Sequence, residues 1–128
     1  MSNIKFKKSG DWTAFGGPSY GAVVDGVRSG AIQGEYVWTG GGCRSQGRKT
    51  KHYRVCLYVP GGVKTVGTSF SLSGAQEIVR RAVASVGYRA VRQPNGQFSV
   101  FNRDGVKQFE SDSFIAVTSK YPAVLANS

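Results

Sequence analysis

One segment, from Ser73 to Gly87, has the apolar spacing of an amphipathic helix, and this segment constrains the fold most. Ser73 is a typical N-cap residue, and Gln76 three positions later completes a capping box. The apolar residues that then share one helical face are Ala75, Ile78, Val79, Ala82, Val83 and Val86. Gly87 stands where a left-handed C-terminal cap belongs. The pattern predicts a helix over about 74–86 that covers one face of a sheet.

Residues on both sides of this segment alternate between apolar and polar side chains, as β-strands do. In the clearest strand, Lys51–Val59, the side chains expected to face the core are Tyr53, Val55, Leu57 and Val59. The opposite side would carry His52, Arg54, Cys56 and Tyr58. Further strands are expected at 4–8, 22–27, 31–39, 63–72, 88–93, 98–101 and 106–109, and 114–118 is either a last strand or a helical turn.

Turn signals divide these strands. We expect Arg28-Ser29-Gly30 to separate 22–27 from 31–39, and Asn95-Gly96 to close a hairpin. Residues 40–50 contain three consecutive glycines and no core pattern, which predicts a loop. The expected fold is α+β: residues 1–128 form one domain, with an antiparallel sheet of about six to seven strands and one helix packed on one face.

The composition supports a folded chain that does not cross a membrane. Hydrophobic residues make up 40% of the 128 residues and charged residues 19%. No apolar run approaches the roughly 20 residues that a membrane span needs, and no apolar stretch follows the basic N-terminal residues. We therefore expect no signal peptide and a cytoplasmic location, or a place inside a virion if the chain is a coat subunit.

Positive charge is the strongest functional signal. The chain has 17 basic and 7 acidic residues, a net charge of +10. Nucleic acid is the commonest partner of such a protein, an anionic membrane surface is the second, and simple solubility is the alternative explanation. The charge is clustered, because no acidic residue lies between Glu35 and Glu77. The basic residues of this interval that we expect to contact phosphates are Arg44, Arg48, Lys49, Lys51 and Arg54.

Aromatic residues flank this basic cluster. Tyr36 and Trp38 share one side of the preceding strand, and Tyr58 lies with His52 and Arg54 on the outer side of the following strand. If the two strands pair, these side chains predict one basic and aromatic platform for unpaired bases. The alternative is that Tyr36 and Trp38 belong to the core and that the loop is a solvated hairpin tip.

Two further basic groups lie outside the cluster. Arg80 and Arg81 fall on the solvent side of the predicted helix, and Arg89 and Arg92 follow on or near the next strand. They extend the nucleic-acid footprint or form a solvated surface. A third group, at 5–8, is explained equally well as protection of an edge strand by lysine.

Enzymatic and metal sites are poorly represented. His52 is the only histidine, and two cysteines, Cys43 and Cys56, are too few for a zinc site and are expected to be free thiols. The acidic residues Asp104, Glu110 and Asp112 flank turns, and no glycine-rich stretch has the Lys-Ser/Thr of a phosphate-binding loop. The sequence predicts no catalytic residue, no metal and no cofactor.

Two resemblances to known families concern parts of the chain. From Ser73 to Asp104, the order of helix, Gly-aromatic, strand, turn and strand resembles the small messenger-cleaving toxins of the HicA type. That family carries a catalytic histidine just after a Gly-Ser in this hairpin, whereas the hairpin here reads Pro94-Asn95-Gly96-Gln97-Phe98. The resemblance therefore implies a similar layout and argues against the activity.

The second resemblance lies in the central strand. The run from Tyr53 to Pro60, Tyr-Arg-Val-Cys-Leu-Tyr-Val-Pro, resembles a strand in the coat proteins of small RNA phages, whose length is similar. Those coats end in helices after their sheet, whereas this sequence predicts a hairpin after its helix. The order of elements therefore differs.

These observations predict a non-enzymatic protein that binds single-stranded or structured RNA or DNA largely independently of sequence. The first alternative is a self-assembling coat or nucleoprotein subunit that packages a genome, and a homo-oligomer is expected. The second alternative is a small basic ribonuclease that uses His52.

Overall fold

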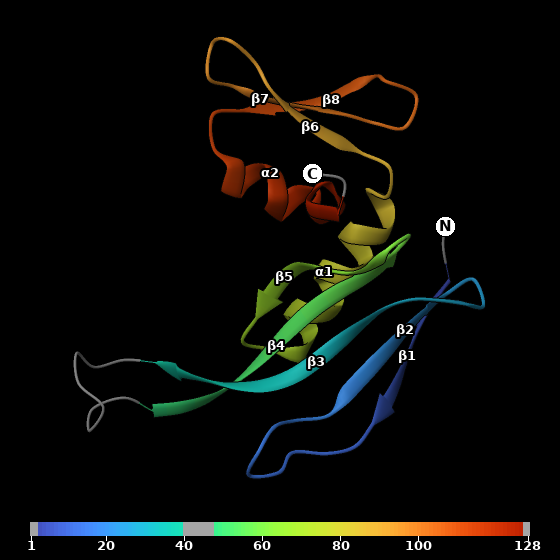
Figure 1. The fold of residues 1–128 in the computed structure, drawn as a ribbon, viewed down its shortest axis with the longest axis vertical. Helices are drawn as coiled ribbons and strands as arrows, with labels where there is room; N and C mark the ends of the chain where they lie inside the picture. The colour runs from blue at the N-terminus through green and yellow to red at the C-terminus, as the bar shows by residue number, and fades with distance from the viewer. Residues whose placement is uncertain (1–2, 40–47, 127–128) are drawn as a thin grey trace.

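The computed structural model describes residues 3–39 and 48–126, whose strands form two antiparallel sheets (Figure 1). The large sheet contains β1 (Ile4–Ser9), β2 (Ser19–Val24), β3 (Val27–Thr39), β4 (Arg48–Val59) and β5 (Gly62–Ser69). The remaining elements are α1 (Leu72–Ala84), β6 (Arg89–Arg92), β7 (Phe98–Phe101), β8 (Lys107–Ser111), α2 (Phe114–Lys120) and the 3₁₀ helix η2 (Pro122–Ala126). The predicted α+β class is confirmed, but the strands are divided between two sheets.

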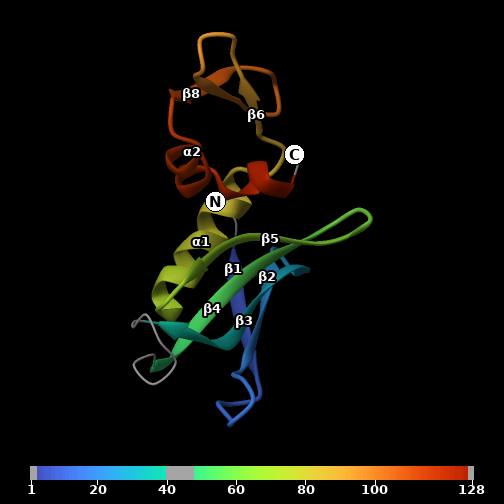
Figure 2. The same ribbon diagram turned by 60° about the vertical axis from the view of Figure 1, so that its left-hand side comes forward.

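The large sheet is a simple meander, in the order β1-β2-β3-β4-β5, and α1 packs on one of its faces (Figure 2). The core between them contains Ile32 and Val55 of the sheet and Ala75 and Val79 of α1, all at most 1% exposed. We call this side of the sheet the helix face. The other side is the open face, because no helix lies on it in the described parts of the chain (Figure 2).

The hairpin between β2 and β3 closes at Asp25-Gly26, not at the break predicted from Arg28-Ser29-Gly30. Asp25 and Gly26 both have positive φ, 50° and 84°, as a type I′ turn requires. Gly30 lies inside β3. Glycine is needed at this position because a Cβ would collide with the carbonyl oxygen of Cys56 on β4. This glycine permits a close approach of two strands and does not end one.

Helix α1 begins two residues earlier than its pattern predicts. Ser71 is the N-cap, and its hydroxyl accepts a hydrogen bond of 3.1 Å from the backbone N–H of Gly74. Ser73, the expected N-cap, lies inside the first turn. The helix also ends two residues earlier than predicted, at Ala84 with Ser85 as its C-cap, and Gly87 follows with positive φ, 86°.

The small sheet, in the order β6-β7-β8, has its own core with α2. Val100 and Val117 are fully buried there. The segment 114–118, for which the sequence allowed a strand or a helical turn, is part of helix α2. The predicted hairpin at Asn95-Gly96 is confirmed, with Gly96 at φ 86°.

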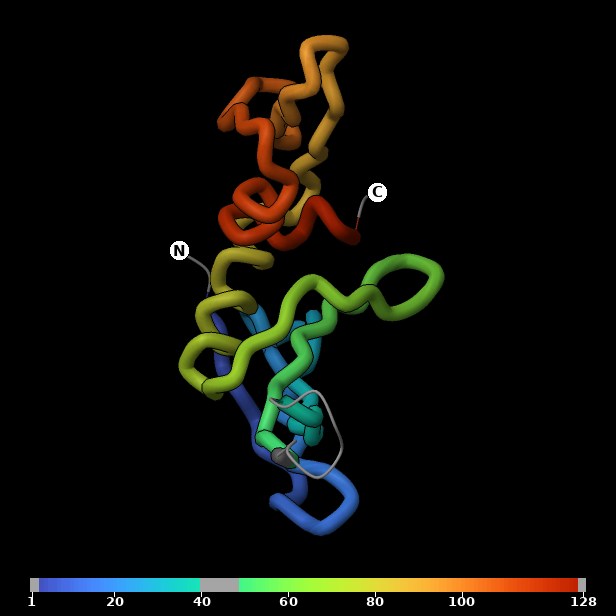
Figure 3. The backbone as a smooth tube through the Cα atoms, turned by 90° about the vertical axis from the view of Figure 1, so that its left-hand side faces the viewer, coloured from blue at the N-terminus to red at the C-terminus, as the bar shows by residue number. Residues whose placement is uncertain are grey.

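The two sheets are joined by α1 and by the C-terminal segment, which folds back between them (Figure 3). Ser85 is 1% exposed at the end of α1, where its hydroxyl donates to the carbonyl of Arg81 at 2.8 Å and accepts from the N–H of Ala123 at 3.2 Å. Ala123 belongs to the large core and its neighbour Val124 to the small one. The prediction of one domain stays a prediction.

Across the residues that the structure describes, no helix is long and apolar enough to span a membrane.

Candidate nucleic-acid interface

The pairing of β3 with β4 divides the predicted platform between the two faces of the sheet. Tyr36 lies opposite Lys51, and Trp38 lies opposite Lys49. Residues directly opposite each other in antiparallel strands project to the same side. These four therefore share a face with Tyr53, the partner of Gly34, and this is the helix face.

The other predicted residues of β4 lie on the open face. Glu35 is opposite His52, and Gln33 is opposite Arg54. Tyr58 follows at the same two-residue alternation. The prediction of one platform that combines Tyr36 and Trp38 with His52, Arg54 and Tyr58 is therefore wrong, although the alternation predicted within each strand is correct.

The open face gathers basic side chains from three strands. Lys5 and Lys7 of β1 lie opposite Val23 and Gly21 of β2, and Val23 in turn lies opposite Arg28 of β3. Arg54 of β4 joins them, and its side chain is 48% exposed. Three strand spacings separate β1 from β4, roughly 14 Å. Arg28 was missed as a candidate because the sequence places it in an apparent break.

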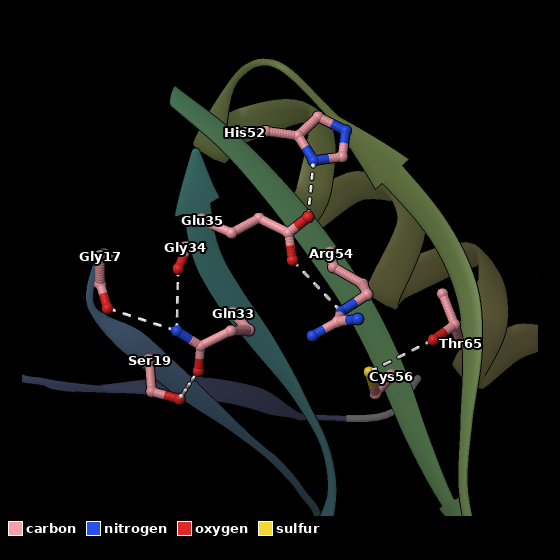
Figure 4. Close-up of polar contacts among 9 residues, drawn as sticks. All are labelled: Gly17, Ser19, Gln33, Gly34, Glu35, His52, Arg54, Cys56 and Thr65. Carbon is pink, nitrogen blue, oxygen red and sulfur yellow. Dashed lines mark hydrogen bonds and ion pairs between the residues drawn. The ribbon is translucent and has the colours of Figure 1, made fainter. Parts of the chain in front are cut away.

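One carboxylate interrupts this positive surface. Glu35 is the only acidic residue in the five strands of the large sheet. Its Oε2 lies 3.4 Å from His52 Nδ1, and its Oε1 lies 3.4 Å from Arg54 Nε (Figure 4). The contact uses one of the five N–H donors of the guanidinium. His52 is held further by an edge-on contact with Phe70, at 5.0 Å between ring centroids.

Hydrogen bonds fix the polar side chains beside this ion pair. The hydroxyl of Ser19 donates to Gln33 Oε1 at 3.0 Å, and Gln33 Nε2 donates to the carbonyl of Gly34 at 2.8 Å (Figure 4). Nearer the other end of the face, the guanidinium carbon of Arg28 lies 5.7 Å from the ring centroid of Tyr58. The open face is therefore polar, basic and held in place by contacts among its own side chains.

The helix face carries a different arrangement at the end of the sheet where β4 begins. Trp12, from the loop between β1 and β2, packs against the rings of Tyr36 and Tyr53 at 5.1 and 5.8 Å between centroids. Lys49 Nζ lies 4.4 Å from the ring centroid of Tyr36, and Lys51 Nζ lies 4.8 Å from that of Trp12. We call this group of five residues the aromatic end.

Two large aromatic side chains are exposed beside the aromatic end. Trp38 is 72% exposed and Phe15 is 99% exposed. The alternative interpretation of Trp38 as a core residue is therefore wrong, whereas Tyr36 is half-buried. The sequence did not identify Trp12 and Phe15 as site residues. The one local signal is Gly17, where a Cβ would collide with the Trp12 ring.

The remaining predicted residues lie elsewhere. Arg44 and the side chain of Arg48 are outside the described parts of the chain, although the backbone of Arg48 begins β4 opposite Thr39. Arg89 and Arg92 are exposed on β6 of the small sheet. Three residues apart on one strand, they point to opposite sides and do not extend the open face.

Among the described residues, no group of three or more His, Cys, Asp and Glu side chains is arranged to hold a metal ion. Comparisons of the chain with models of protein families, with curated proteins and with solved structures found no match.

Proposed function

We propose that this chain binds RNA or DNA along the open face of its large sheet, chiefly through the phosphate backbone. The observation that carries the proposal is the distribution of charge: Lys5, Lys7, Arg28 and Arg54 share a face whose only strand carboxylate is Glu35. Phosphate contacts supply most of the affinity of sequence-independent binding.

The geometry favours contacts to the backbone over readout of a duplex sequence. Reading the major groove usually takes a helix or a two-stranded ribbon inserted into it. The longer helix, α1, buries Ala75, Val79 and Ala82 against the large sheet, so its apolar face serves the core. Basic groups spread across several strands suit a ligand that lies over the sheet.

The salt dependence of binding tests this proposal. Four contacts to a single strand predict that log K falls with log salt concentration at a slope of roughly −3. In the double variant Arg28→Gln/Arg54→Gln the slope is expected to become shallower by about 1.4, because each phosphate contact contributes about 0.7. Fluorescence anisotropy with a labelled mixed-sequence 12-mer measures both values.

The matched control is Arg89→Gln/Arg92→Gln, which removes the same charge from the small sheet. It is expected to keep the wild-type slope. If the slope became equally shallow in the two double variants, binding would depend on net charge and not on the open face. A flat salt response of the wild-type protein would reject nucleic-acid binding.

A second candidate function, a self-assembling subunit that packages a genome in a virion, is favoured by the outer strand β5. The opposite edge strand, β1, carries Lys5, Lys7 and Lys8, which discourage pairing with another sheet. β5 carries only Lys64, and Val63 and the following Phe70 are 58% and 60% exposed. An edge of this kind suits contacts between copies of the chain.

Light scattering coupled to size-exclusion chromatography separates the two candidates. A large particle that contains nucleic acid would support the subunit, and Val63→Lys should then reduce it to small species. Monomers or dimers that bind added oligonucleotide would support the binding module.

The ribonuclease alternative is favoured only by the position of His52, which contacts Glu35, the carboxylate that also pairs with Arg54. Incubating the protein with a labelled RNA 12-mer tests it. Cleavage that disappears in His52→Ala would establish the enzyme, and intact RNA would remove this alternative.

A further inference from the structure

The loop between β1 and β2 is fixed to the aromatic end by several independent contacts. Tyr36 Oη donates to the carbonyl of Thr13, and Lys49 Nζ donates to that of Ala14, both at 2.8 Å. The N–H of Gly17 donates to the carbonyl of Gly34 at 3.1 Å, and the N–H of Gly34 donates to that of Pro18 at 2.8 Å. The loop is thereby held as a fixed support.

Two aromatic rings are exposed to solvent beside the cation of Lys49, one on this loop and one on β3. Phe15 lies at the tip of the loop next to Ala14, the residue that Lys49 contacts, and Trp38 lies directly opposite Lys49 across the strand pair. Both rings are exposed, at 99% and 72%. Large aromatic rings exposed on a strand and on a fixed loop are typical of recognition surfaces.

The charge around these rings selects the class of partner. The basic side chains of the aromatic end are Lys49 and Lys51. The one carboxylate of the β1–β2 loop, Asp11, is paired with Lys8 at 3.8 Å. A partner that combines flat rings with negative charge matches this surface. Unpaired nucleotides have both properties, because each base offers a π-face and each linkage a phosphate.

We propose that Trp38 stacks on an unpaired base whose phosphate contacts Lys49, which makes single-stranded nucleic acid the preferred ligand of this protein. The inference rests on the proposed function and deepens it. Trp38 and Glu35 are three residues apart on β3, roughly 10 Å along the strand, and they project from opposite faces of the sheet. Stacking on Trp38 and phosphate binding on the open face are therefore separate contacts.

The two tryptophans of the chain allow a direct test, because only Trp12 and Trp38 are present. In the Trp12→Phe protein all tryptophan fluorescence comes from Trp38. Titration with a 12-residue oligothymidylate is expected to quench it strongly, whereas a perfectly paired 12-base-pair duplex is not. In the Trp38→Phe protein, fluorescence of the packed Trp12 should change little.

Affinity supplies the second readout. Trp38→Ala is expected to weaken binding of the oligothymidylate by roughly 5- to 100-fold, from the usual contribution of one stacked base. Trp38→Phe should recover part of this loss, and duplex affinity should stay within about twofold of wild type. If Trp12→Phe fails to fold, as judged by circular dichroism, the difference between wild type and Trp38→Phe gives the same quenching.

The outcomes separate this inference from the proposed function. Oligothymidylate that binds without quenching, or an equal loss of single-strand and duplex affinity in Trp38→Ala, would overturn stacking and leave the open face as the binding surface. Failure of the wild-type protein to bind either ligand at low salt would overturn both.

Discussion

The two faces of the β3–β4 pair are built from the same stretch of sequence but have different chemistry. On the open face, the cation of Arg54 lies against a carboxylate, and the neighbouring side chains are fixed by polar hydrogen bonds. At the aromatic end, the cations of Lys49 and Lys51 lie over the rings of Tyr36 and Trp12. The first arrangement suits an extended phosphate backbone, and the second suits single exposed bases.

The comparison shows how one basic cluster is divided by the strand periodicity. Lys49, Lys51 and Arg54 lie within six consecutive residues. Lys49 and Lys51 nevertheless project from the helix face, and Arg54 projects from the open face. Charge density counted along the sequence therefore overestimates the charge on either surface. Side chains distant in sequence, such as Lys7 and Arg28, restore it on the open face.

The largest expected effect comes from a change that disturbs both faces at once. In Gly30→Ala the new methyl group would collide with the backbone carbonyl of Cys56 and force β3 away from β4. We expect a loss of about 3 kcal/mol or more in the free energy of unfolding, measured by urea denaturation.

Gly21→Ala is the matched control, since a Cβ there meets no atom closer than 3.9 Å. It should change stability by less than about 1 kcal/mol. Similar losses in the two variants would show that the close approach at Gly30 is not what holds the faces in register.

A smaller effect should separate the two faces. In Gly17→Ala, a Cβ would lie 2.6 Å from the Trp12 ring and displace it from Tyr36 and Tyr53. We expect a loss of about 1–3 kcal/mol in stability and weaker binding of oligothymidylate, with duplex affinity retained. Gly16→Ala, where a Cβ has open space, serves as the control. Loss of duplex binding in Gly17→Ala would contradict the independence of the faces.

The smallest effect should be a gain. Glu35→Gln removes the negative charge from the open face and frees Arg54, so affinity should rise by roughly 2- to 10-fold at low salt. Glu77→Gln is matched to it, because Glu77 also pairs with arginine, here Arg80 and Arg81 on α1. An equal gain in both variants would mean that only net charge is being measured.

Much of the fold followed from local patterns in the sequence. Residues Tyr53, Val55 and Leu57 were expected in the core and are at most 9% exposed. The helix and the Asn95-Gly96 turn were also predictable, because each depends on interactions between residues close in sequence. The predicted N-cap, Ser73, is wrong because Ser71 is an equally suitable residue. The choice between them depends on where the extended backbone gives way to helix, which is at Ser71.

The site was less predictable because it depends on which residues of two strands lie opposite each other. Alternation shows that Tyr36 and Trp38 share a side, but a shift of one residue in the pairing moves a whole set to the other face. The pairing of Tyr36 with Lys51, and not with His52, is a property of the folded sheet. Arg28 was hidden for a related reason: Asp25-Gly26 is itself a hairpin signal, and the Gly30 nearby obscured it.

The measurement that most directly tests the open face as the binding surface is NMR detection of arginine Nε–H groups during titration with a mixed-sequence 12-mer. The signals of Arg28 and Arg54 are expected to shift and broaden at low salt and to return toward their free positions as salt is added. The signals of Arg80 and Arg103, on α1 and in the β7–β8 turn, should not move. Shifts confined to Arg80, Arg89 and Arg103, with Arg28 and Arg54 unchanged, would contradict it.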